Sequence, residues 1–218
     1  MFVKVCGITT EEDALLAVAM GADAVGFIFA PSPRRVSARV AGQIASRLPP
    51  QVVTVGVFRD ELPERVIEIV NTAGLKVAQL HGRESADVVA QVATHVRHVI
   101  KAFPATSDEL ARAAGFPADA LLIDGPNPGS GAVFDWRIAE GLPHTRRVII
   151  AGGLSGDNVA AAIGFVHPWG VDASSGLESS PGRKDPMKVR AFVRAAKAAD
   201  PEREDASLDG PYDWADEN

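Results

Sequence analysis

The sequence predicts an α/β fold, a single-domain (β/α)8 TIM barrel, on two observations. Short β-branched runs alternate with amphipathic stretches eight times along residues 2–198, the pattern of parallel strands that are each followed by a covering helix. Eight such units in about 200 residues fit the lower size limit of this barrel. A doubly wound open sheet is the alternative, but the first strand is not followed by Gly-x-Gly-x-x-Gly with an acid about 20 residues further on.

Each expected strand is a short run of mostly apolar, often β-branched residues. The runs are 2–6, 24–29, 52–58, 76–79, 98–101, 120–124, 147–151 and 170–173. The expected helices are the amphipathic stretches 11–20, 38–46, 62–73, 85–94, 107–114, 135–141, 157–163 and 186–198. At the first of these helices, Thr9 or Thr10 can accept hydrogen bonds from free backbone amides, and Gly21 ends the helix.

The composition is that of an ordinary globular protein, with 218 residues of which 46% are hydrophobic and 23% charged. No apolar run approaches the ~20 residues that cross a bilayer, and the first residues do not form a signal peptide, so we expect a cytoplasmic protein without membrane contact. The single cysteine, Cys6, permits no internal disulfide. No Cys and His residues have zinc-ligand spacing, and we expect neither a metal nor another cofactor.

The negative charge is concentrated in the last residues. The net charge is -6, and residues 200–218 contain eight acids against one base. We expect these residues to form a disordered acidic tail and residues 1–199 to form the barrel, which is the catalytic domain. The body is close to neutral and shows no basic stripe, so nucleic acid is not an expected partner.

In a (β/α)8 barrel, the residues that follow each strand lie at one rim, where the functional groups are found. Polar residues and glycines stand at these positions here. They are Cys6, Arg34, Gln79, His81, Asp124, Gly152, Gly153, Ser174, Ser175 and Gly176. Ordinary structural alternatives are a buried thiol for Cys6, a solvated loop side chain for Arg34 and a turn residue for Asp124. For His81, a rim histidine that hydrogen-bonds the backbone is the expected role.

The glycines and serines after the seventh and eighth strands indicate a phosphate site. Glycines let the backbone approach an anion closely, and free amides at a helix start point toward it. Gly152-Gly153 alone could be a tight turn. Paired with Ser174-Ser175-Gly176 on the next strand, it occupies the position where such barrels recurrently bind phosphate.

Cys6 and Asp124 together suit proton transfer on a sugar phosphate. Partial burial at the barrel mouth can raise the pKa of an aspartate enough to make it a proton donor. A free thiol titrates near ~8.5, and Arg34, Lys4 or a bound group could lower the Cys6 pKa enough to make it a base. One group would remove a carbon-bound proton while the other protonates a departing ring oxygen. Arg34 could hold a second anion, such as a carboxylate, in a bidentate pair.

A series of motifs along residues 3–195 resembles one enzyme family. They are Lys4-Val5-Cys6-Gly7-Ile8-Thr9, Gly21-Ala22-Asp23-Ala24-Val25-Gly26-Phe27-Ile28-Phe29, Ser32-Pro33-Arg34, Gly56-Val57-Phe58, Gln79-Leu80-His81-Gly82, Gly129-Ser130-Gly131, Ala151-Gly152-Gly153-Leu154 and Val171-Asp172-Ala173-Ser174-Ser175-Gly176-Leu177-Glu178. In this order they resemble phosphoribosylanthranilate isomerase. That tryptophan-pathway enzyme converts N-(5-phosphoribosyl)anthranilate to its 1-deoxyribulose 5-phosphate isomer by an Amadori rearrangement.

The resemblance implies a role for each site residue. Cys6 matches the general base and Asp124 the general acid, and Arg34 matches the arginine that meets the anthranilate carboxylate, although Arg35 beside it leaves open which of the two does so. The residues expected to bind substrate are Arg34, Gln79, His81, Gly131, Gly152, Gly153, Asp172, Ser174, Ser175 and Gly176. The implied partner is the small-molecule sugar phosphate, and the expected assembly is a monomer or homodimer. The acidic tail extends beyond the family's usual end.

Two other hypotheses keep the same fold. An indole-glycerol-phosphate synthase or a ribulose-phosphate epimerase would need a catalytic lysine or a metal centre at the strand ends, and Lys101 is the lysine to examine. A non-catalytic sensor of phosphate ligands would need the phosphate loops but not both Cys6 and Asp124. Turnover of phosphoribosylanthranilate without added metal would separate these hypotheses from the isomerase.

Overall fold

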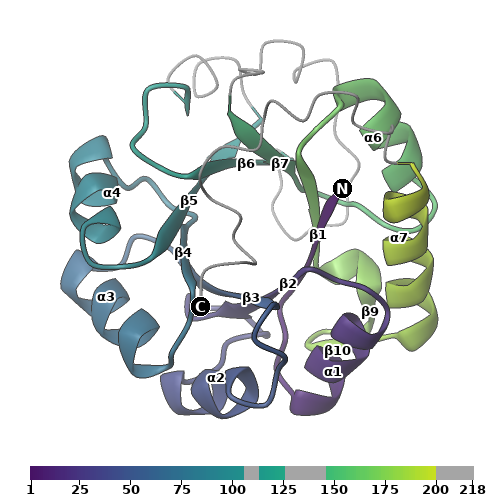
Figure 1. Cartoon of the computed structure of the whole chain (residues 1–218), viewed down its shortest axis with the longest axis horizontal. Helices are drawn as coiled ribbons and strands as arrows, with labels where there is room; N and C mark the ends of the chain where they lie inside the picture. Colours follow the sequence, from purple (N-terminus) through teal and green to yellow (C-terminus); the bar gives the residue numbers. More distant parts are fainter. Residues whose placement is uncertain (106–112, 126–145, 200–218) are drawn as a thin grey trace.

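The computed structural model describes residues 1–105, 113–125 and 146–199, whose strands form a closed parallel barrel. Figure 1 shows the strands as an inner ring. In barrel order they are β1 (Phe2–Cys6), β2 (Ala24–Ile28), β3 (Val53–Phe58), β4 (Val77–Leu80), β5 (His98–Pro104), β6 (Ala120–Asp124), β7 (Arg147–Ile150) and β8 (Gly170–Ala173). The predicted (β/α)8 barrel is therefore confirmed, and β8 closes it by pairing with β1.

The described helices surround this ring (Figure 1). They are α1 (Glu11–Ala19), α2 (Ala38–Ala45), α3 (Pro63–Thr72), α4 (Ala86–Ala93), α6 (Val159–Val166) and α7 (Pro186–Ala198). The helix predicted at 135–141, most of the helix predicted at 107–114 and the tail 200–218 lie outside the described residues. Within the described ranges, no helix is long and apolar enough to cross a membrane.

Local hydrogen bonds decide where two of the helices begin. Thr10 is the N-cap of α1, and its side chain accepts a hydrogen bond from the amide of Asp13. The helix predicted at 157–163 begins later, at Val159. The reason is a turn before it, in which Asn158 Oδ1 accepts from Ser155 N at 2.8 Å and Asn158 Nδ2 donates to Gly153 O at 2.9 Å.

The barrel separates two apolar cores, because successive side chains of a strand point to opposite faces. On β1, Val3 and Val5 belong to the core between the strands and the helices. Cys6 belongs instead to the cluster that fills the inside of the ring. Lys4 alternates with Val3 and Val5 and therefore shares the inner face with Cys6, which puts a charged side chain inside the barrel.

A short hairpin lies between β8 and α7, and the sequence pattern does not indicate it. The 3-10 turn η2 (Ser175–Leu177) leads into β9 (Glu178–Ser180), which pairs with β10 (Arg183–Lys184) in antiparallel orientation. Thr9 Oγ1 donates a hydrogen bond to Gly182 O at 2.6 Å, so the hairpin is tied to the loop after β1. Figure 1 shows it beside α1 and α7. The hairpin brings Glu178 and Lys184 to the rim where the strands end.

Candidate active site

The carboxyl ends of the strands surround a cavity of about 270 Å³. Every described residue that the sequence predicts for the site lines it: Cys6, Arg34, Gln79, His81, Asp124, Gly152, Gly153, Asp172, Ser174, Ser175 and Gly176. Ile28, Val57 and Ala151 add apolar wall. Gly131 lies outside the described residues. The strand ends thus bring distant parts of the sequence into one pocket.

Cys6 ends β1 and is 7% exposed at the floor of this cavity. Burial raises the pKa of the Cys6 thiol, while the charge of Lys4 opposes the shift and the charge of Asp172 adds to it. The expectation that neighbouring cations lower this pKa below its ordinary value is therefore wrong here, because loss of hydration outweighs them. Lys4 is nevertheless the strongest of the neighbours that favour the thiolate.

Asp124 stands at the end of a hydrogen-bonded chain of three side chains. Its carboxylate is almost buried, and Oδ2 lies 3.0 Å from Nε2 of His81. The other ring nitrogen of His81, Nδ1, lies 2.9 Å from Nε2 of Gln79. With the Gln79 amide donating to Nδ1, the ring hydrogen is on Nε2, and His81 donates to Asp124. The expectation that the His81 side chain bonds the backbone is therefore wrong.

A buried ion pair supports the loop that carries His81. Lys101 Nζ donates to Glu84 Oε2 at 2.9 Å and to the carbonyl oxygen of Gly82 at 2.7 Å. Glu84 in turn accepts hydrogen bonds from the amides of Gly82 and Asp60. Lys101 alternates with Ile100, which faces the inside of the barrel, and it does not line the cavity. Its contacts therefore give it a structural role and remove the argument for a catalytic lysine.

Arg34 reaches the cavity from the loop after β2, and Glu178 fixes its orientation. Arg34 Nε donates to Glu178 Oε1 at 2.7 Å, and Nη2 donates to Oε2 at 2.8 Å. Lys184, whose side chain is fully buried, donates to Glu178 Oε1 at 3.1 Å. Burial opposes ionisation of Glu178, but its hydrogen bonds with Arg34 and Lys184 outweigh burial and lower its pKa. Arg35 is exposed and does not line the cavity.

Gly7 makes room for this arrangement. Its φ is +78°, a conformation that side chains with a Cβ rarely adopt. A Cβ there would lie 2.7 Å from Arg34 Cδ and 2.7 Å from Ser174 Oγ. The glycine that follows Cys6 thus lets an arginine and a serine from two other loops come close to the end of β1.

The two glycine-containing loops after β7 and β8 pack directly against each other. A Cβ at Gly176 would collide with the carbonyl oxygen of Leu154, so the second loop can approach the first only with a glycine at this position. Ser174 Oγ, at the end of β8, is buried and has no hydrogen-bond partner among the described residues. A buried hydroxyl without a partner is costly, and it is typical of a group that meets a ligand.

Comparison with known proteins shows the family that shares this sequence and fold. The family described as N-(5'phosphoribosyl)anthranilate (PRA) isomerase matches residues 3–195 of this chain. The chain belongs to this family. The resemblance drawn from the motifs is thereby confirmed.

Individual PRA isomerases match over nearly their whole length. The enzyme of Desulforudis audaxviator is 48% identical over 90% of this chain and 98% of its own. The crystal structure of the Thermus thermophilus PRA isomerase has a TM-score of 0.86 at 43% identity, covering 91% of this chain and 99% of that chain. A third PRA isomerase, 37% identical with a TM-score of 0.81 over 91% of this chain and 99% of that chain, was solved in complex with reduced 1-(o-carboxyphenylamino)-1-deoxyribulose 5-phosphate.

Two charged residues beside the site, Glu178 and Lys184, are not singled out by the sequence, and Lys4 is named there only as a cation that could lower the pKa of Cys6. Lys4 precedes Cys6 by two positions, and Glu178 and Lys184 lie on the hairpin after β8. Glu178 and Lys184 lie within or beside the family motifs, but the motifs do not indicate a function for either residue. Strand alternation could have placed Lys4 on the same face as Cys6, and it was the one usable signal.

Proposed function

We propose that this protein isomerises N-(5′-phosphoribosyl)anthranilate to 1-(2-carboxyphenylamino)-1-deoxyribulose 5-phosphate in tryptophan biosynthesis, with Cys6 as general base and Asp124 as general acid. The observation that carries the proposal is that both groups line one cavity with an arginine and two glycine-containing loops. A thiol and a carboxyl group can supply the two proton transfers of an Amadori rearrangement without a cofactor.

The reaction needs a proton delivered to the ring oxygen and a proton removed from C2′, two atoms that are both bonded to C1′. Asp124 donates a proton to the furanose ring oxygen as the bond between that oxygen and C1′ breaks, which leaves a protonated imine between C1′ and the anthranilate nitrogen. The Cys6 thiolate then removes the proton from C2′, and the electron pair of that bond forms an enolamine. The enolamine then tautomerises: C1′ gains a proton and the C2′ hydroxyl loses one, which gives the aminoketone. The aldose carbon is reduced and C2′ is oxidised within one molecule.

The phosphate of the substrate fits the loops after β7 and β8. The amides of Gly153, Ser175 and Gly176 and the unpartnered hydroxyl of Ser174 can donate to phosphate oxygens. Gln79 Oε1 and Asp172 Oδ1 are also buried, line the cavity and have no hydrogen-bond partner among the described residues. They can accept from the hydroxyl groups of the ribose. Binding at the phosphate, remote from C1′ and C2′, orients the reacting carbons.

Arg34 fits the carboxylate of the anthranilate ring. Within the described part of the chain, its side-chain hydrogen bonds to Glu178 use Nε and Nη2, which leaves Nη1 for a ligand in the cavity. The ion pair with Glu178 and Lys184 holds the guanidinium in one orientation, so little conformational freedom is lost when the substrate binds.

We expect Arg34→Lys to raise the KM for phosphoribosylanthranilate by about 10- to 100-fold and to change kcat less. The reason is that an ammonium group cannot contact Glu178 and a second carboxylate in the same planar geometry. Steady-state kinetics with the purified variant measure both constants. The matched control is Arg35→Lys, an exposed arginine outside the cavity, which should keep the wild-type KM. The opposite ranking of the two variants would assign the carboxylate to Arg35.

The activity itself is tested by incubating the purified protein with phosphoribosylanthranilate in the presence of a chelator and following substrate loss and product formation by chromatography. We expect catalytic turnover, because proton transfer by Cys6 and Asp124 requires no metal. Tight binding of the product without turnover, at high protein concentration, would instead support a sensor that retains the fold.

We also propose that the enzyme works in the cytoplasm, since its substrate is a phosphorylated biosynthetic intermediate that carries charge and does not cross membranes unaided. The prediction of a monomer or homodimer stays a prediction. Sedimentation of the purified chain distinguishes the two states.

A further inference from the structure

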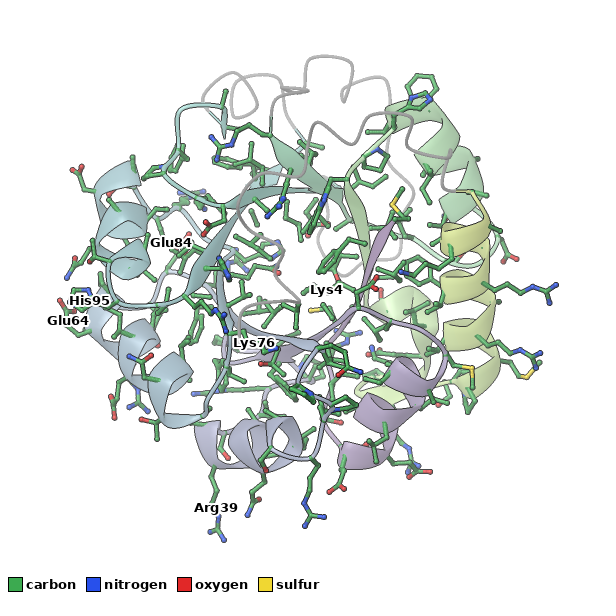
Figure 2. All side chains as sticks on the ribbon, viewed as in Figure 1. Lys4, Arg39, Glu64, Lys76, Glu84 and His95 are labelled. Carbon is green, nitrogen blue, oxygen red and sulfur yellow. The ribbon has the colours of Figure 1, made fainter. Side chains whose placement is uncertain are left out.

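Lys4 is a fully buried lysine inside the barrel, on the same face of β1 as Cys6. Figure 2 shows Lys4 within the ring of strands, whereas Arg39 extends outward from α2. A lysine at this depth has lost its hydration, which is costly unless another group compensates for it. The mechanism of the reaction gives Lys4 no direct contact with the reacting carbons.

Asp172 supplies the first compensation. It stands directly opposite Lys4 in the pairing of β1 with β8, and Lys4 Nζ lies 3.0 Å from Asp172 Oδ2. Both side chains are buried or almost buried. An apolar pair of similar size is often as stable as a buried ion pair, so the pair by itself is weak evidence for a role in stability. It holds the ammonium at a fixed position below the cavity.

The fixed ammonium lies next to the thiol. Gly26, which pairs with Cys6 on the neighbouring strand β2, shows how close the two groups are: a Cβ added at Gly26 would lie 2.8 Å from Cys6 Sγ and 3.1 Å from Lys4 Nζ. Each larger side chain at this position would push the thiol and the ammonium out of place. The glycine therefore leaves a shared space in which Lys4 and Cys6 meet.

Among the described residues, charged groups from several elements interact with Cys6. They are Lys4 on β1, Asp172 on β8, Lys184 on β10 and Arg34 in the loop after β2. Burial raises the pKa of Cys6, Asp172 raises it further, and Lys4 opposes both more strongly than Lys184 does. Lys184 and Arg34 are already engaged with Glu178. Lys4 is therefore the cation that is best placed to stabilise the thiolate of Cys6.

We propose that Lys4 is a positioning residue for catalysis: its ammonium, held by Asp172, stabilises the thiolate of Cys6 that removes the proton from the substrate. The proposal rests on the proposed function in taking Cys6 as the base. It explains why a buried ion pair lies beneath a thiol on the inner face of the barrel.

The test measures the thiol directly. Cys6 is the sole cysteine of the chain, so the ultraviolet absorbance of the thiolate and the rate of alkylation by iodoacetamide report on this residue alone. In Lys4→Met we expect the alkylation rate at neutral pH to fall by about tenfold or more, since each unit by which the thiol pKa rises reduces the thiolate tenfold. The alkaline rise of kcat should move to higher pH by the same amount.

Lys4→Met leaves Asp172 buried without its partner and could fail to fold, so the double variant Lys4→Met/Asp172→Asn is measured with it. Removing both charges should still slow alkylation, but less than Lys4→Met alone does, because Asp172 raises the Cys6 pKa and Lys4 opposes it more strongly. Lys4→Arg should keep most of the wild-type rate. The matched control is Arg39→Met, which removes an exposed cation from α2 and should leave the titration of Cys6 unchanged.

A folded double variant that alkylates at the wild-type rate, or a titration curve unchanged from the wild type, would overturn the role of Lys4. A slowed alkylation in a protein that does not turn over phosphoribosylanthranilate would overturn the proposed function but leave the effect of Lys4 on the thiol intact. The two failures are therefore distinguishable.

Discussion

Cys6→Ala should lower kcat for the isomerisation of phosphoribosylanthranilate by about 10²- to 10⁴-fold, the usual contribution of a positioned general base. The methyl group of alanine cannot accept the C2′ proton. The KM should change less, because the phosphate loops and Arg34 are untouched. Steady-state kinetics with the purified variant measure both constants.

The control measures whether Cys6→Ala still folds and still binds a ligand of the active site. Cys6→Ala should keep the far-ultraviolet circular dichroism of the wild type and its affinity for a reduced product analogue, since the substitution removes one sulfur atom from a buried position. Cys6→Ser should be nearly as inactive, because a hydroxyl group in this buried site stays protonated. Wild-type turnover in either variant would remove Cys6 from the role of base.

The pH dependence provides a second measurement on the same group. Only the thiolate can accept a proton, and burial raises the pKa of the thiol above its ordinary value. The activity of the wild type should therefore still increase with pH across the neutral range and level off only in the alkaline range. A profile that is already flat below neutral pH would contradict the base assignment.

Asp124→Asn should lower kcat by a similar factor of about 10²- to 10⁴-fold, because an amide cannot donate an acidic proton to the ring oxygen as the ring opens. Asparagine has nearly the shape of aspartate, and its Oδ1 can still accept the hydrogen bond from His81. The cavity should therefore keep its form, and kcat should fall more than KM rises. Single-turnover kinetics locate the loss in the chemical step.

Asp157→Asn is the matched control for this variant. Asp157 is an exposed acid close to the loop after β7, and it does not line the cavity, so its substitution should leave kcat unchanged. Equal losses in Asp124→Asn and Asp157→Asn would point to a general effect of charge. Full activity in Asp124→Asn would require another acid for ring opening.

The barrel could be predicted because its signals are local. The alternation of β-branched runs with amphipathic stretches depends only on near neighbours in the chain, and it places Cys6 and Asp124 at strand ends without any knowledge of packing. The helix at 157–163 was misplaced because the turn that delays it depends on the side chain of Asn158, which the apolar pattern does not show.

The site residues could be predicted as a set, since parallel strands deliver their ends to one rim. The side chains that these residues contact could not be predicted. Arg34 forms a hydrogen bond with Glu178, which is 144 positions away in the sequence, and Lys4 forms one with Asp172, which is 168 positions away. His81, directly after β4, meets Asp124 at the end of β6, and the ion pair of Lys101 with Glu84 holds the loop that follows His81. No pattern within a single segment indicates such pairs.

By itself, the sequence determined the barrel, the residues at its rim and the family motifs, because strand alternation and short motifs are properties of consecutive residues. Only the tertiary structure decided the electrostatic state of the site. It showed that burial outweighs the nearby cations at Cys6, that Lys4 lies beneath the thiol and that Glu178 orients Arg34. The energy of a charge depends on its distance from water and from other charges, and both are set when the barrel closes.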